Sequence, residues 1–239
     1  MTEAPAPPRV KQPVMYQEWN RLSFIHWRYP AETVQALLPD GLEVETCDGS
    51  AWIGLVPFLM QGVRPPVLPV TPWLSEFPET NLRTYVRDRR GRSGVWFFSL
   101  DAARMPAVLT GRAGYALPYF WSRMRVEVDG DRISYRSRRR WPGPQGAHAD
   151  VEVRLGPPLT ESEADPLAHF LTARYRLFSV IAGRLVVAEA EHPPWPLHRV
   201  ELLRLEVDLL TAAGLPAPRG EPLGHASPGV QVRIGMWHP

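Results

Sequence analysis

The segment 122–138 constrains the fold of this chain more than any other feature. Apolar residues alternate with charged or polar ones on both sides of Asp129-Gly130, at Met124, Val126, Val128, Ile133 and Tyr135. A period of two residues around an Asp-Gly pair predicts two antiparallel strands joined by a tight turn. One face of this hairpin is apolar and the other is charged, so the hairpin needs a core to lie on.

Short segments with strand character recur along the chain. Beyond the hairpin, strands are predicted at 42–47, 51–59, 82–88, 94–100, 174–181, 184–191 and 230–237. Asp48-Gly49 and Ala182-Gly183 favour tight turns between neighbouring strands. Many short strands predict a barrel or sandwich of the α+β class, mainly antiparallel β, rather than a βαβ sheet.

Few segments have helical signals. Helices are predicted at 30–38, where Pro30 suits a first helical position, and at about 165–173. Asp165-Pro166 offers the second helix a cap and a first-turn proline. Asp101 follows an apolar strand and is interpreted as the cap of a turn.

Length and composition indicate one cytoplasmic domain. The 239 residues have a mass of 27.0 kDa, which suits a disordered, proline-rich lead-in at 1–13 and a single domain at 14–239. The only cysteine is Cys47, so an intramolecular disulfide is excluded and a reducing compartment fits. No run of 18 apolar residues occurs, and no membrane span is predicted.

Charged residues argue against nucleic acid and against metal. The formal net charge is only +2, and the basic residues comprise one lysine, Lys11, and 26 arginines. The run 136–140 contains four arginines but follows an amphipathic hairpin without stacking aromatics, so a solvated strand end is favoured. His192 and His198 are six residues apart, a spacing that suits no metal motif. Neither a metal nor a cofactor is predicted.

Five segments together resemble one family. They are FPETNLRTYV at 77–86, GVWFFSLDA at 94–102, LPYFWSRM at 117–124, FLTARYRLF at 170–178 and HPPWPLHR at 192–199. In this order they resemble the YqjF-like family of uncharacterised bacterial proteins, a branch of the acetoacetate-decarboxylase-like superfamily. The resemblance covers roughly residues 14–237. It implies a mainly antiparallel β-barrel domain with a few short flanking helices and a central pocket.

The resemblance also implies what the pocket lacks. Decarboxylases of the superfamily form a Schiff base through a lysine in a G-Y-P-K type turn, and the similar turn here is 116–119, with Tyr119 in the place of the lysine. A phenol cannot form an imine, so Schiff-base decarboxylation is not expected. Glu79 resembles one pocket glutamate and Arg21 the pocket arginine, whereas the second glutamate is absent near Gly54-Leu55.

Each candidate residue has a functional and a structural interpretation. Glu79 is a general base or one half of an ion pair, and Tyr119 is a hydrogen-bond donor to a ligand or a packed aromatic. His192 and Trp195 lie around a rigid Pro-Pro pair that presents them to a cavity or simply covers the barrel end. Arg174 anchors an anion or forms a salt bridge.

The function predicted from these residues is a small-molecule pocket. The catalytic candidates are Glu79, Tyr119 and His192, and the ligand-binding candidates are Arg21, Asn81, Arg83, Arg174 and Trp195. The ligand is expected to carry a carbonyl or carboxylate, and a lyase-like or hydrolase-like reaction is compatible with this set. The alternative is a non-catalytic binding or sensing module that keeps the cavity without the chemistry. No membrane or nucleic-acid partner is expected, and a homo-oligomer is allowed.

Overall fold

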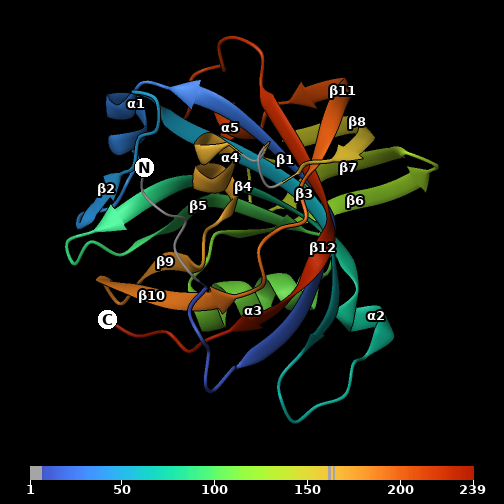
Figure 1. Cartoon of the computed structure of the whole chain (residues 1–239). Helices are drawn as coiled ribbons and strands as arrows, with labels where there is room; N and C mark the ends of the chain where they lie inside the picture. Colours follow the sequence, from blue (N-terminus) through green and yellow to red (C-terminus); the bar gives the residue numbers. More distant parts are fainter. Residues whose placement is uncertain (1–6, 161–162, 164) are drawn as a thin grey trace.

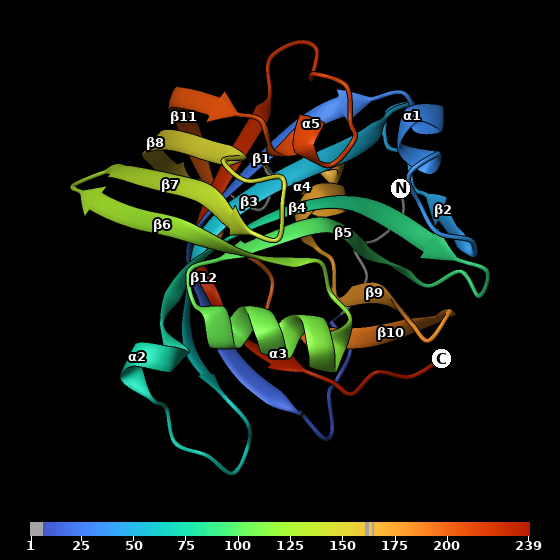
Figure 2. The same cartoon turned by 180° about the vertical axis from the view of Figure 1, so that it is seen from behind.

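Strands dominate the computed structural model, which describes residues 7–160, 163 and 165–239 (Figures 1 and 2). Its helices are α1 (Ala31–Gln35), α2 (Pro72–Ser75), α3 (Met105–Tyr115), α4 (Pro166–Thr172) and α5 (Leu209–Ala212). Its strands are β1 (Met15–Tyr29), β2 (Leu42–Val44), β3 (Ala51–Arg64), β4 (Phe77–Asp88), β5 (Ser93–Ala102), β6 (Tyr119–Asp129), β7 (Arg132–Trp141), β8 (His148–Pro158), β9 (Arg176–Ile181), β10 (Arg184–Glu191), β11 (His198–Val207) and β12 (Leu223–Ile234). No helix in the described residues is long and apolar enough to cross a membrane.

Two closed rings of strands share one wall. The first ring has the order β5-β6-β7-β8-β11-β12-β1-β3-β4 and closes through the β4–β5 pairing. The second ring has the order β5-β9-β10-β12-β1-β3-β4; it includes the β10–β12 pairing and closes through the same β4–β5 pairing. The wall that the two rings share consists of β12, β1, β3, β4 and β5. Within the described residues every strand pairing is antiparallel except β5–β6 and β5–β9. The predicted fold class, α+β and mainly antiparallel with short flanking helices, is confirmed.

The shared wall is buried on both faces. Because successive side chains of a strand point to opposite faces, β1, β3 and β4 send alternate residues into each ring. Ile25, Leu55 and Leu82 belong to the core of the first ring, which also contains side chains of β7, β8 and α5. Phe24 and Phe58 face the second ring, where α4 packs over them. A strand in this position needs apolar residues at nearly every position, as the burial of β3 shows.

The predicted hairpins are mostly confirmed. β6 and β7 form the hairpin expected from the alternation, with Gly130 at φ 59° in its turn. β9 and β10 pair as predicted around Ala182-Gly183. Asp48-Gly49 does form a tight turn, but it closes only the isolated Cys47–Ser50 bridge. The predicted pairing of 42–47 with 51–59 is otherwise wrong, because β2 pairs with the edge of β4.

The two predicted helices, α1 and α4, are both present, with different starts and lengths. Asp165 caps α4, its side chain accepting a hydrogen bond from the Ala168 N–H at 2.7 Å, and Pro166 occupies the first turn as predicted. α1 is shorter than the predicted 30–38 and has Pro30 as its cap rather than its first residue. The 11-residue helix α3 was not predicted.

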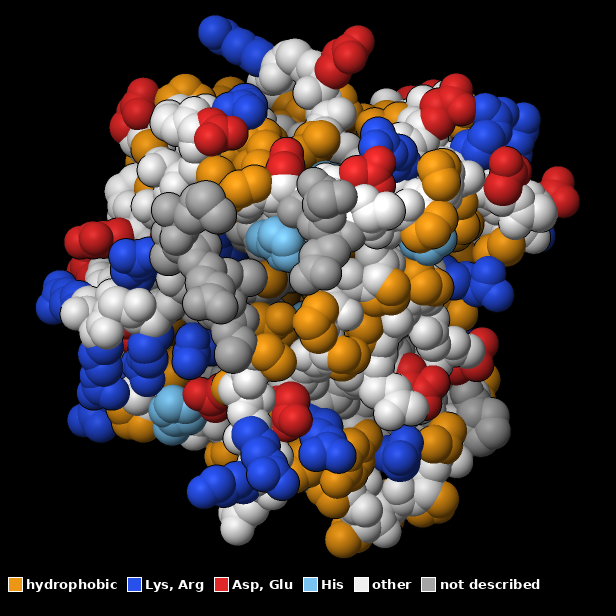
Figure 3. All heavy atoms as spheres, viewed as in Figure 1, with side chains coloured by type: hydrophobic (Ala, Val, Ile, Leu, Met, Phe, Trp, Pro, Cys, Tyr) orange, Lys and Arg blue, Asp and Glu red, His pale blue; other side chains and the backbone are white. Residues whose placement is uncertain are grey.

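One residue of the predicted lead-in, Val10, is held against the domain; residues 1–6 of the lead-in lie outside the described part of the chain. Val10 is buried, and its N–H donates to Glu191 Oε2 at 2.7 Å. Lys11 next to it is exposed. Figure 3 shows apolar side chains across the middle of the face seen in Figure 1, with basic side chains gathered toward its lower left edge, where β10 and the last residues lie.

Candidate functional site

Glu79 and Tyr119 meet inside the second ring. Glu79 lies on β4 opposite Phe58 of β3, and Tyr119 begins β6. The Tyr119 hydroxyl donates to Glu79 Oε2 at 3.3 Å. Gly111 of α3 makes room for the ring, since a Cβ added there would lie 2.2 Å from Tyr119 Cδ2. This hydrogen bond brings together two of the three predicted catalytic candidates.

Burial controls the charge of both groups. Glu79 is 2% exposed, and burial raises its pKa to about 8, although hydrogen bonds from Tyr119 and Asn81 oppose the rise and the Asp101 charge adds to it. No arginine in the described part of the chain lies within ion-pair distance of Glu79. Burial and the neighbouring Glu79 raise the pKa of Tyr119 well above its usual value. Tyr119 therefore stays a phenol, and Glu79 is a carboxylic acid that can lose its proton slightly above neutral pH.

Polar side chains continue along the same face of β4. Asn81 and Arg83 follow Glu79 at two-residue intervals and therefore point into the same ring. Arg83 Nη2 donates to the Leu171 carbonyl at 3.3 Å, and its guanidinium lies 5.7 Å from the ring centroid of Phe24. Arg83 Nε and Asn81 Oδ1 are buried without a hydrogen-bond partner among the described residues. A donor and an acceptor are thus left unpaired on one buried face.

His26 of β1 adds an acceptor that the sequence did not indicate. Its Nε2 lies 2.6 Å from the Tyr85 hydroxyl, which itself donates to the Leu171 carbonyl at 2.8 Å. Since the hydroxyl has one hydrogen, Nε2 carries the imidazole proton and Nδ1 is a bare acceptor without a partner in the described residues. Burial, followed by the charges of Arg83 and His225, holds the pKa of His26 well below its usual value.

His192 and Trp195 lie in the second ring but in an aromatic cluster. His192 is buried, with Nδ1 2.8 Å from the Pro193 carbonyl and Nε2 3.4 Å from the Arg174 carbonyl. Its ring centroid is 4.8 Å from that of Trp195, whose Nε1 donates to the Thr172 carbonyl at 3.0 Å. Burial lowers the pKa of His192. Both ring nitrogens lie near backbone carbonyls, so the imidazole holds the segment 192–195 against Arg174, just after the end of α4.

Neither Arg21 nor Arg174, two of the predicted anion anchors, is placed to hold an anion beside Glu79. Arg21 is exposed, has φ 53° and uses its carbonyl to accept from the Tyr135 hydroxyl at 2.7 Å. Tyr135 belongs to the first ring, so the structure does not bring Arg21 to Glu79. Arg174 is buried and forms a salt bridge with Glu45. Its charge is already neutralised, which is the structural alternative stated for it.

Asp101 requires a correction. It was interpreted as a turn cap, yet it is fully buried on the face of β5 that points into the first ring. Its carboxylate accepts from Arg139 Nε at 2.9 Å, Arg139 Nη2 at 2.7 Å and Ser122 Oγ at 2.6 Å. The interpretation of the run 136–140 as solvated is therefore wrong for Arg139. Its side chain points inward, because successive side chains of β7 alternate between the two faces of the sheet.

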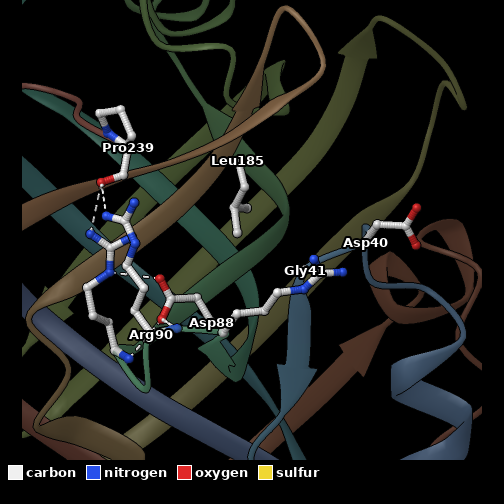
Figure 4. Close-up of a pocket in the computed structure, with 8 residues that line it drawn as sticks. Asp40, Gly41, Asp88, Arg90, Leu185 and Pro239 are labelled. Carbon is white, nitrogen blue, oxygen red and sulfur yellow. Dashed lines mark hydrogen bonds and ion pairs between the residues drawn. The ribbon is translucent and has the colours of Figure 1, made fainter.

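Two surface clefts are formed by other residues. One, of about 320 Å³, lies beside Asp40, Asp88 and Leu185. Arg90 also lines it, and its Nη1 donates to the Pro239 carbonyl at 3.0 Å (Figure 4). The other, of about 610 Å³, runs over β6, β7 and β8. Neither is lined by the polar residues of the second ring. No group of three or more His, Cys, Asp or Glu within the described ranges is placed to hold a metal ion.

Comparisons with known proteins agree with this architecture. Residues 16–231 match the model of the DUF2071 family, described as uncharacterized conserved proteins. The uncharacterized protein YqjF of Bacillus subtilis (strain 168) is 39% identical over 213 residues, which is 89% of this chain and 86% of that protein. A solved acetoacetate decarboxylase superposes with a TM-score of 0.67 at 18% identity, covering 98% of this chain and 91% of its own. The enduracididine biosynthesis enzyme MppR, complexed with pyruvate, gives 0.64 at 14% identity, covering 98% and 90%. The chain therefore belongs to the DUF2071 family, and its fold is that of the acetoacetate-decarboxylase-like proteins.

Proposed function

We propose that this protein is an enzyme that binds a small carboxylate-bearing carbonyl compound in the second ring and moves a proton on it. The observation that carries the proposal is the set of unpaired polar atoms on one buried face: Arg83 Nε, Asn81 Oδ1 and His26 Nδ1. Buried polar groups are nearly always hydrogen-bonded, so a cluster of exceptions beside a carboxyl of raised pKa is characteristic of a ligand site.

The chemistry follows from the two ends of the site. Arg83 is the cation available to hold a ligand carboxylate, since Arg174 is paired with Glu45. At the other end Glu79, with a pKa of about 8, exchanges a proton near neutral pH. In its carboxylate form Glu79 removes a proton from the carbon next to the ligand carbonyl. The hydroxyl of Tyr119 then donates to the oxygen on which negative charge develops.

A Schiff base has no place in this scheme. The single lysine, Lys11, is exposed and outside the second ring. The pyruvate bound by the structural neighbour MppR makes 2-oxo acids reasonable first probes. Incubation with pyruvate or acetoacetate and borohydride is expected to leave the intact mass of the protein unchanged. A stoichiometric adduct would contradict the proposed absence of an imine.

A non-catalytic binding module is the second candidate. One observation favours it: Glu79 and its neighbours are enclosed, and the described clefts lie elsewhere. On this alternative the site holds a ligand without transferring its protons.

One experiment separates the two candidates. Ligand-observed NMR with pyruvate in D₂O reports binding as line broadening and proton transfer as loss of the methyl signal. We expect exchange with the native chain, loss of exchange with retained broadening in Glu79→Gln, and loss of both in Arg83→Gln. Glu221→Gln, at an exposed position, serves as the control. Broadening without exchange identifies the binding module, and unchanged broadening in a folded Arg83→Gln variant would refute the site.

A further inference from the structure

The outer face of the β6–β7–β8 arm carries a basic cleft that the second-ring site does not use. These strands lie side by side at one edge of the molecule in both views (Figures 1 and 2). The cleft has a volume of about 610 Å³. Its basic walls are Arg123, Arg125, Arg136, Arg138 and His148.

Strand register arranges these side chains in two rows. Arg123 of β6 pairs with Arg138 of β7, which pairs with His148 of β8. Two residues along, Arg125 pairs with Arg136 and then with Asp150. Residues two apart on a strand share a face and lie roughly 6–7 Å from each other. The two rows therefore stand parallel on the outer face.

The side chains between the rows point the other way. Met124, Ser137 and Ala149 form the register row in between, and Ser137 and Ala149 are buried. Their backbone is therefore the floor of the cleft, and the flanking arginines are its walls. A shallow trough with cationic walls and a peptide floor can accept an anion no wider than the gap between the rows.

Acidic partners are unevenly placed in the two rows: in the row of Arg123 and Arg138 only His148 has one, its Nδ1 lying 2.9 Å from Asp208 Oδ2. Arg125 contacts Glu127 at 2.7 Å, and Arg136 lies 3.8 Å from Asp150. Arg123 and Arg138 have no acidic partner within ion-pair distance among the residues that the structure describes. Like charges directly opposite each other on neighbouring strands are unfavourable, so this pair is a place where a bound anion relieves repulsion.

We propose that this cleft is a binding site for a small polyanion of the diphosphate class. Arginine forks match phosphate oxygens bidentately, and two parallel rows suit two adjacent anionic groups. Single-stranded nucleic acid is a poorer fit, because apart from His148 no lining residue offers a ring for base stacking. A second copy of this face is also disfavoured, since the two surfaces carry the same charge.

Titration with inorganic pyrophosphate, followed by calorimetry at low and at physiological ionic strength, tests the site. We expect saturable binding that weakens with salt, and a Kd at least about tenfold higher in Arg123→Gln/Arg138→Gln. Arg132→Gln is the matched control, because Arg132 lies on the same outer face of β7 but pairs with Glu152 at 3.6 Å outside the cleft. The control should bind like the native chain.

Two kinds of result would overturn the proposal. One is the absence of saturable binding by the native chain, or equal binding by the folded double variant. The other is displacement of pyrophosphate by a short single-stranded oligonucleotide at a lower phosphate concentration, which would make nucleic acid the preferred occupant. Pyruvate exchange at the second-ring site is independent of both results.

Discussion

Replacing Glu79 by glutamine tests whether this carboxyl is a buried acid or one half of an ion pair. Burial raises its pKa from 4.5 to about 8. Between these values the folded protein holds one more proton than the unfolded chain, so the free energy of unfolding falls by about 1.36 kcal/mol per pH unit as pH rises. Over the whole interval the native chain loses roughly 4–5 kcal/mol, and glutamine, which cannot ionise, loses nothing.

The variant should therefore match the native chain at low pH and exceed it at high pH. We expect a difference within about 1 kcal/mol at pH 5. At pH 9 the melting temperature of Glu79→Gln should be about 10 °C higher, since about 1 kcal/mol shifts a domain of this size by 2–4 °C. Thermal and urea denaturation from pH 5 to 9 measure this, with Glu221→Gln as the exposed control. A variant that is several kcal/mol less stable at every pH would refute the reasoning.

Two further predictions concern packing around the site. Arg139→Met should cost about 3–5 kcal/mol in urea denaturation, because it leaves the Asp101 carboxylate buried and unpaired. Adding Asp101→Asn should recover part of that loss, and failure to do so would contradict the ion pair. Gly111→Ala should cost about 1–3 kcal/mol by pushing Tyr119 off α3. Gly114→Ala, with no atom within 4 Å of its added Cβ, should stabilise the same helix by up to about 1 kcal/mol, so equal effects would contradict this contact.

The sequence predicted most strands but missed β1, β8 and β11. The hairpin of β6 and β7 alternates cleanly and was placed correctly. β1 was missed because residues 22–27 are buried on both faces, which removes the period-two signal. α3 was missed because Gly111 and Gly114 lower its helix propensity. Burial by two rings is a tertiary property that local periodicity does not report.

The candidate site was predicted in part, through the family resemblance. It indicated Glu79 and Tyr119, which do meet. It indicated Arg21 but not His26, although both lie on β1. The positive φ of Arg21 and the register shift between Asn20 and Ile25 show that β1 is irregular here. Because a shift of one residue moves a side chain to the opposite face of a sheet, a sequence match alone does not fix which residue of β1 faces the site. A histidine inside an otherwise apolar run was the available signal for His26.

The distribution of polar residues on β4 argues that the second ring is kept for a ligand rather than for stability. Glu79, Asn81 and Arg83 all point into this ring, whereas the opposite face of the strand contributes Leu82 to the first core. A buried polar atom without a partner costs roughly 1–3 kcal/mol, and Asn81 Oδ1 and Arg83 Nε are two such atoms among the described residues. Natural chains retain such costs mainly where function requires them. The first ring pairs its buried carboxylate Asp101 with Arg139. Beside the second ring Arg174 is paired with Glu45, whereas Arg83 has no acidic partner among the described residues and its Nε has no hydrogen-bond partner there. This difference supports the proposal that a ligand binds beside Arg83.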